Sequence, residues 1–215
     1  MIVVDSISKS FGQRTLWSSV SFTAKEGEMV AIVGPSGCGK STLLNCLGLL
    51  DRVDQGAIEV AGRNITRLRS GAERRFRRNT LGYLFQNYAL IENANVEFNL
   101  SIAAKGGRRR SALHDRFAEA LRSVGLEGRE KEMVYRLSGG EQQRLALARL
   151  VVKKPTVVLA DEPTGALDSE NSDLVIRLLR KMAEEGCAVA IATHSKSVQS
   201  NCDFTIALGQ EPTPR

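Results

Sequence analysis

The chain has 215 residues, of which 42% are hydrophobic and 25% are charged, proportions that exclude a disordered, collagen-like or coiled-coil protein. Lysine and arginine exceed aspartate and glutamate by six, which admits nucleic acid, an anionic membrane surface or a phosphate ligand as partner. The apolar stretches are far shorter than the roughly 20 residues that cross a bilayer, and residues 1–5 lack the pattern of a secretory signal. We therefore expect a soluble, cytoplasmic protein.

Short β-rich runs alternate with helical patterns along the chain. Strands are expected at residues 2–4, 20–23, 29–33, 57–60, 81–85, 157–159, 188–193 and 205–208. Helices are expected at residues 40–47, 72–78, 111–124, 140–152 and 170–184. The runs 29–33 and 157–160 are almost wholly apolar, as in strands buried on both faces of a parallel sheet. Since strands gather in residues 1–62 and helices in 87–152, the pattern predicts an α/β core interrupted by a mostly helical insertion.

The strongest local motif is Gly-Pro-Ser-Gly-Cys-Gly-Lys-Ser-Thr at residues 34–42, between a predicted strand and a predicted helix. It fits the phosphate-binding pattern GxxxxGK[ST] in its required context, although a glycine-rich turn without a ligand is the alternative. Its glycines let successive backbone N–H groups face one concavity. Lys40 should reach the β- and γ-phosphates, and Ser41 should bind Mg²⁺. The nucleotide-binding residues expected here are Gly34, Pro35, Ser36, Gly37, Cys38, Gly39, Lys40, Ser41 and Thr42.

An acidic pair, Asp161 and Glu162, follows the second buried run. A phosphate-binding loop needs a carboxylate on a neighbouring strand to hold hydrated Mg²⁺, and Asp161 is placed for this. Glu162 is placed to polarise a water in line with the γ-phosphate. The alternative is that the pair caps a following helix.

A further motif, Leu-Ser-Gly-Gly-Glu-Gln-Gln-Arg at residues 137–144, separates this chain from kinases and GTPases. Ser138 and the glycines that follow it precede a helical pattern, which makes a second anion site with exposed N–H groups, or an ordinary N-cap. One nucleotide needs only one phosphate cradle. Two sites make sense if two copies pair head-to-tail, each offering its Ser138 turn to the nucleotide of the other.

Together these motifs resemble the ATP-binding-cassette (ABC) ATPase family, and the resemblance covers essentially the whole chain. It implies an α/β P-loop fold with a mostly parallel core sheet, an N-terminal antiparallel β subdomain and a helical insertion subdomain. Residues 1–215 would then form a single domain, with the core and β subdomain in 1–86 and 153–215 and the helical signature subdomain in 87–152. The family signature, which corresponds to residues 137–142 here, departs from the common pattern, because Glu141 stands where glutamine is common.

The resemblance also implies roles for individual residues and for ATP and Mg²⁺. Phe11 would stack on adenine, although alone it would be read as a core or edge residue. His194, at the end of a predicted strand, would contact the γ-phosphate, although a lone histidine is more often structural. The implied catalytic residues are Glu162, His194 and Gln86. The implied Mg²⁺ ligands are Ser41, Gln86 and Asp161. The implied nucleotide contacts outside the loop are Phe11, Ser138, Gly139, Gly140 and Asp168.

Finer features resemble the macrolide- and lipoprotein-export (MacB/LolD) group, and residues 87–93 look most like small ATPases of bacteriocin or peptide export. This implies a subunit that binds and hydrolyses ATP, forms a homodimer with ATP, and powers a separate membrane permease from the inner face of the membrane. The cargo would be a peptide, bacteriocin, lipoprotein or drug. The alternative is an FtsE-like ATPase that regulates a cell-wall hydrolase without transport. No nucleic-acid partner is expected, since Ser138 follows Ser41 by only 138 − 41 = 97 positions, which leaves no room for the coiled coils of DNA-repair relatives.

Overall fold

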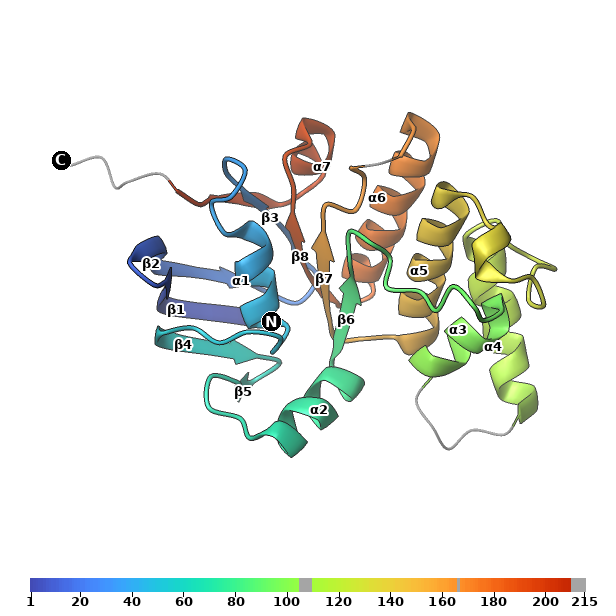
Figure 1. The fold of residues 1–215 in the computed structure, drawn as a ribbon, viewed down its shortest axis with the longest axis horizontal. Coiled ribbons are helices and arrows are strands. Elements are labelled where there is room, and N and C mark those ends of the chain that lie inside the picture. Colours follow the sequence, from blue (N-terminus) through green and yellow to red (C-terminus); the bar gives the residue numbers. More distant parts are fainter. Residues whose placement is uncertain (105–109, 166, 210–215) are drawn as a thin grey trace.

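A computed structural model describes residues 1–104, 110–165 and 167–209 (Figure 1). Its larger sheet is parallel, with strand order β6-β7-β8-β3-β9. These strands are β3 (Met29–Val33), β6 (Leu81–Leu84), β7 (Val157–Asp161), β8 (Ala188–Ala192) and β9 (Phe204–Ala207). Every residue of β8 is buried, and so are the first four of β3 and of β7. Burial on both faces explains why these runs are wholly apolar rather than alternating.

A second, antiparallel sheet has the order β2-β1-β4-β5. Its strands are β1 (Ile2–Phe11), β2 (Arg14–Ala24), β4 (Gln55–Val60) and β5 (Arg63–Asn64). One apolar cluster joins this sheet, helix α1 (Lys40–Leu47) and one face of the parallel sheet, through residues such as Ile7, Leu44 and Ile32. The expected antiparallel β subdomain is therefore present, and α1 lies between the two sheets (Figure 1).

Helices occupy most of the chain between β6 and β7. They are α3 (Val96–Ala103), α4 (Arg110–Ser123) and α5 (Gly139–Lys153), with a short 3₁₀ helix at Val134–Arg136. Helix α5 packs against α3, α4, β6 and α6 (Ser169–Glu184), so a second apolar cluster spans these helices and the other face of the parallel sheet. This is the expected helical insertion (Figure 1); its division from the core near residues 87 and 152 stays a prediction.

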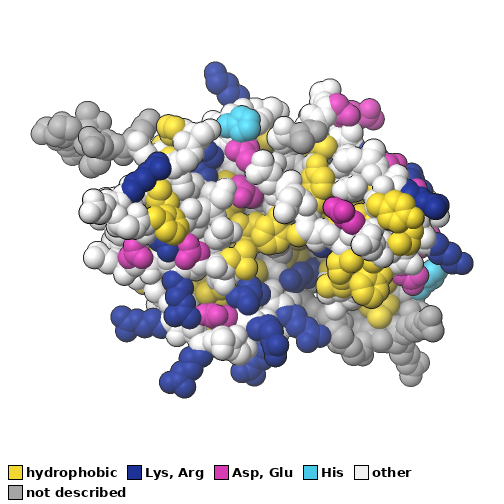
Figure 2. All heavy atoms as spheres, in the orientation of Figure 1, with side chains coloured by type: hydrophobic (Ala, Val, Ile, Leu, Met, Phe, Trp, Pro, Cys, Tyr) yellow, Lys and Arg dark blue, Asp and Glu magenta, His cyan; other side chains and the backbone are white. Residues whose placement is uncertain are grey.

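The surface is strongly basic around α2 (Ser70–Asn79), where Phe76 is the buried residue among exposed or half-buried neighbours. Arginines of this region gather along one edge of the face drawn in Figure 2. A short helix, α7 (Lys196–Ser200), connects β8 to β9. Within the described ranges, no helix combines the length and the apolar character that a membrane crossing needs.

Candidate nucleotide-binding site

The loop between β3 and α1 wraps around the ammonium group of Lys40. Lys40 Nζ donates to the carbonyl oxygens of Gly34 at 2.9 Å and Pro35 at 3.2 Å. Gly39 caps α1 with φ of +95°, and a Cβ there would lie 2.7 Å from Trp17 Nε1. The loop is thus held by its own lysine and by the antiparallel sheet, with the N-terminus of α1 available to a phosphate.

Ser41 and Asp161 meet where α1 begins and β7 ends. Ser41 Oγ donates to Asp161 Oδ1 at 3.0 Å. Burial, with the nearby Glu162 carboxylate, raises the pKa of Asp161 above its usual value, although Ser41 and Lys40 act in the opposite direction. No group of three or more His, Cys, Asp or Glu side chains suited to a metal occurs among the described residues. One hydroxyl and one carboxylate fit Mg²⁺, which protein sites hold through one or two carboxylates together with substrate phosphates and water.

Glu162 and His194 lie at the ends of the adjacent strands β7 and β8, where Asp161 pairs with Ala192. His194 Nδ1 lies 2.9 Å from Glu162 Oε1, and the His194 backbone N–H donates to Glu162 Oε2 at 3.4 Å. The Glu162 backbone has a φ of +45°, a conformation that costs energy in a residue with a side chain. Its carboxylate is largely buried at 15% exposure, whereas the His194 ring is 72% exposed. The carboxylate is thus held in place beside a ring that solvent or a ligand can reach.

Gln86 follows β6, the neighbour of β7, and its side chain is exposed. It makes no hydrogen bond with any residue in the ranges that the structure describes. The next turn is held from α5: Arg149 donates to the carbonyls of Tyr88 and Ala89, the latter at 2.6 Å. Both of those residues have positive φ, 62° and 47°. Gln86 therefore follows the strand next to the one that ends in Asp161, on a segment that Arg149 ties to α5.

Phe11 stands at the tip of the β1–β2 hairpin with 54% of its surface exposed. The hairpin contacts the phosphate-binding loop, because Arg14 donates to the Gly37 carbonyl at 3.2 Å. Lys9 Nζ lies 4.9 Å from the centre of the Phe11 ring, a cation–π geometry. An exposed aromatic ring beside the loop is available to stack on a base.

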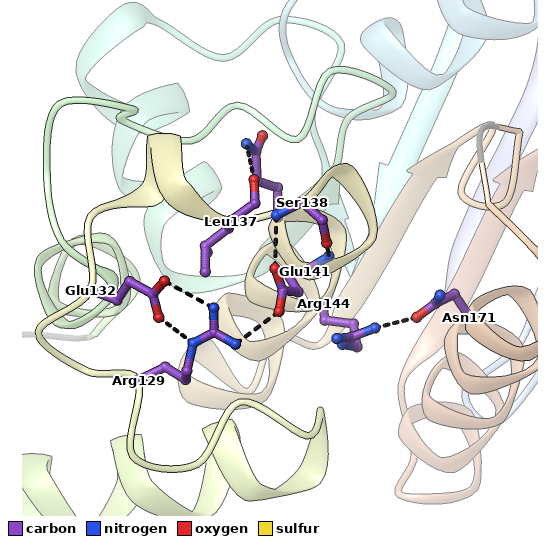
Figure 3. A network of polar contacts seen from close by, with 8 residues as sticks. Arg129, Glu132, Leu137, Ser138, Glu141, Arg144 and Asn171 are labelled. Carbon is purple, nitrogen blue, oxygen red and sulfur yellow. Dashed lines mark hydrogen bonds and ion pairs between the residues drawn. The ribbon is translucent and has the colours of Figure 1, made fainter.

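Ser138 caps α5 in a reciprocal arrangement with Glu141 (Figure 3). The Glu141 backbone N–H donates to Ser138 Oγ at 3.3 Å, and the Ser138 backbone N–H donates to Glu141 Oε2 at 2.7 Å. Among the described residues, no hydrogen bond or ion pair joins Ser138, Gly139 or Gly140 to the loop at residues 34–42. The fold thus brings Lys40, Ser41, Asp161 and Glu162 together but leaves the Ser138 turn apart from them.

Asp168 caps α6 and is connected to α5 rather than to the phosphate-binding loop. Its carboxylate accepts from the Asn171 backbone at 2.8 Å and from the Asn171 side chain, and these bonds lower the pKa of Asp168. Arg144 of α5 donates to Asn171 Oδ1 (Figure 3). Residue 166, two positions before Asp168, lies outside the described residues. The structure therefore joins the Asp168 turn to the helix that begins at Ser138.

Several residues that build the site escape prediction from the sequence, among them Arg14, Trp17, Arg129 and Arg149. Each contacts a segment 12 to 61 residues away along the chain. No local pattern marks such a partner. Glu141 is the local signal that points toward Arg129, because a carboxylate near the Ser138 turn favours a cationic neighbour.

The sequence pattern of the family described as "ABC transporter" matches residues 17–165. The chain belongs to the ABC transporter family. It is 41% identical over 190 residues to the macrolide export ATP-binding/permease protein MacB of Shigella flexneri, covering 88% of this chain and 29% of that protein. The MacB of Pectobacterium atrosepticum is 39% identical over 195 residues, covering 90% and 30%. The chain thus spans about 30% of the length of these relatives.

Two solved structures of the ATP-binding cassette MJ0796 superimpose closely. A dimeric post-hydrolysis state bound to ADP and Pi gives a TM-score of 0.87 at 33% identity, covering 97% of this chain and 94% of that one. A dimeric structure described as a bacterial ABC transporter cassette gives 0.87 at 34% identity with the same coverage. These findings confirm the predicted ABC ATPase fold. They also confirm that the chain is related to export proteins of this family. The roles of individual site residues stay predictions.

Proposed function

We propose that this chain binds ATP with Mg²⁺, pairs with a second copy around two nucleotides, and uses hydrolysis to drive a separate membrane permease. One observation carries the proposal: the Ser138 turn, a helix N-terminus suited to an anion, has no bond to the phosphate-binding loop of its own chain within the described residues. A second copy in the opposite orientation supplies that turn. The dimers of the MJ0796 cassette support this arrangement.

The site residues divide the chemistry among them. Lys40 and the loop N–H groups bind the phosphates, while Phe11 stacks on the base. Ser41, Asp161 and Gln86 would hold Mg²⁺, which would supply positive charge beside the phosphates. Glu162 accepts a proton from the water that attacks the γ-phosphorus, as the bond to the β-phosphate oxygen breaks.

In this proposal, His194 orients the carboxylate of Glu162. Its Nδ1 contact fixes one carboxylate oxygen, and its own backbone N–H contacts the other. With both oxygens oriented, the carboxylate is held for a water on the γ-phosphate side, and the exposed imidazole can reach the phosphate itself. Asp168 acts at the same edge, through the turn that it caps, toward the nucleotide of the partner copy.

The surface of α3 is the proposed contact with the permease. Phe98 and Ile102, one helical turn apart, are 51% and 55% exposed, and Tyr135 is 55% exposed. Exposed large apolar side chains gather on the helical side of the face in Figure 2. Such a patch indicates a protein interface. The segment between Gln86 and α3 would carry motion from the permease to the nucleotide.

The proposed cargo direction is export, and the cargo a peptide, bacteriocin, lipoprotein or drug. The MacB relatives are named as macrolide export proteins and combine an ATP-binding part with a permease, of which this chain corresponds to about 30% of the length. They do not support the alternative of a cell-wall regulator without transport. The chain would accordingly act at the inner face of the membrane, on a permease held in another polypeptide.

The test is ATP-dependent dimerisation of the Glu162→Gln variant. Without the carboxylate that accepts the proton, ATP should persist and trap the pair, so size-exclusion chromatography with ATP and Mg²⁺ should show a dimer and the ATPase rate should fall at least about 100-fold. The matched control is Glu162→Gln with Lys40→Ala, which removes a charge partner of the phosphates and should remain monomeric. A Glu162→Gln protein that binds ATP yet stays monomeric at all salt concentrations would refute the composite site.

A further inference from the structure

Glu141 places a negative charge in the first turn of α5, beside the Ser138 turn. A carboxylate there suits the helix, because it complements the positive end of the dipole and completes the capping box. It is unfavourable, however, where a second anion must approach the same helix end. The Ser138 backbone bond and Arg129 hold the pKa of Glu141 below its usual value, so the charge persists at neutral pH.

Arg129 lies against this carboxylate and offsets part of its charge (Figure 3). Its Nη1 donates to Glu141 Oε1 at 2.8 Å, and this is the carboxylate oxygen that does not bond Ser138. The rest of the guanidinium binds Glu132 in a two-point contact, in which Nη2 donates to Oε1 at 2.9 Å and Nε donates to Oε2. Glu132 thereby fixes the plane of the guanidinium, and Arg129 is directed at a single oxygen of Glu141.

The backbone that carries Arg129 is also fixed. The Glu132 and Glu130 carbonyls accept hydrogen bonds from the N–H groups of Val96 and Glu97, each at 2.9 Å. These are the first residues of α3, whose first-turn N–H groups have no partner within the helix. Arg129 therefore sits on a segment anchored to α3 and contacts the side chain that orients Ser138.

We propose that Arg129 is a positioning residue for the Ser138 turn: it offsets part of the charge of Glu141 and holds that carboxylate on the Ser138 backbone, so that the turn can receive a phosphate of the partner copy's nucleotide. The inference rests on the proposed function. It assigns a reason for the departure at position 141, because a glutamine there would cap Ser138 without any need for a cation.

The experiment measures the ATP concentration that gives half-maximal dimer in the Glu162→Gln background, by analytical ultracentrifugation. Arg129→Ala should raise it about tenfold, as expected for one uncompensated charge near a phosphate, and the penalty should shrink as salt is added. Arg129→Lys, which keeps the charge but not the fork, should recover part of the loss. The decisive variant combines Arg129→Ala with Glu141→Gln: once the carboxylate is gone, removing Arg129 should no longer weaken dimerisation relative to Glu141→Gln alone.

Arg122→Ala is the matched control. It breaks another Arg–Glu pair of the helical region, in which Arg122 Nη2 lies 2.8 Å from Glu127 Oε1 on the exposed surface, and it should leave the ATP requirement unchanged. If Arg129→Ala equals this control, or if its defect is as large in the Glu141→Gln background, the proposal is overturned. If the parent Glu162→Gln protein itself fails to dimerise, the proposed function fails instead. Thermal melting of each variant confirms that the fold is intact.

Discussion

Gly39 is the position at which the antiparallel sheet fixes the phosphate-binding loop, and Gly39→Ala should disrupt both stability and nucleotide binding. Two costs add at this residue. Its φ of +95° is unfavourable for any residue with a Cβ, at about 1–2 kcal/mol. The new methyl group would also lie 2.7 Å from Trp17 Nε1 and 3.0 Å from Leu16 Cδ1, an overpacking that costs roughly 1–3 kcal/mol.

Gly62→Ala separates the two costs. Gly62 has a φ of +72°, but a Cβ there would meet nothing within 4 Å. It should therefore lose only the backbone part, about 1–2 kcal/mol, and the entropy that alanine removes from the unfolded chain is the same for both variants. The difference between the two variants, roughly 1–3 kcal/mol, isolates the steric contact with Trp17.

Urea unfolding followed by far-ultraviolet circular dichroism gives both free energies without relying on Trp17 fluorescence. Calorimetric titration with ATP then tests function. Gly39→Ala should bind ATP at least about tenfold more weakly, because the Gly39 carbonyl accepts from Leu43 at 2.8 Å to begin α1 and any shift moves the helix N-terminus. Gly62→Ala should bind normally. Equal destabilisation of the two variants, or unchanged ATP affinity in Gly39→Ala, would refute the reasoning.

Two further predictions concern charged groups of the site. Burial raises the pKa of Asp161 above 3.8, so its ionised form costs folding free energy at neutral pH and this cost disappears on acidification. Asp161→Asn should therefore raise the Tm of the nucleotide-free protein at about pH 7.5 and lose that gain toward about pH 4; the same gain at both pH values in differential scanning fluorimetry would contradict this. Arg149→Ala should accelerate hydrogen exchange in residues 86–91 while α5 stays protected, since the carbonyls of Tyr88 and Ala89 lose their donor. Arg149→Lys cannot donate to both carbonyls equally well, so residues 86–91 should exchange at an intermediate rate in that variant. If these residues exchange as slowly in Arg149→Ala as in the parent protein, Arg149 does not anchor the segment.

The parallel core could be predicted because its sequence signals are local. Strand β3 and residues 157–160 of β7 are apolar throughout, and each run is followed directly by residues of chemical interest. Since parallel strands share one carboxyl edge, order along the chain already places Lys40, Asp161 and His194 at the same edge. The continuous apolar runs in the sequence were enough to predict these strands, and no distant contact had to be known.

Other elements escaped prediction for physical reasons. Strands β1 and β2 extend well beyond the expected residues 2–4 and 20–23. Their full length could not be predicted because polar residues occur along them and bulges interrupt the register, with Ser6 and Ser19 at positive φ. Helix α3 was missed because its sequence leaves large apolar side chains on the solvent side as well as in the core. Its apolar pattern therefore does not follow one buried face.

Two arginines from the helical part explain how nucleotide and permease surfaces could influence one another. Arg149 holds the segment after Gln86, and Arg129 holds the Ser138 turn while its neighbours bond the start of α3. Helices α3, α4 and α5 share one apolar cluster, and close packing transmits displacement rather than absorbing it. A permease that displaces α3 would thus shift Gln86 toward or away from its own nucleotide and Ser138 toward or away from that of the partner. The two ends of the composite site would then respond together, because both are tied to the same packed helices.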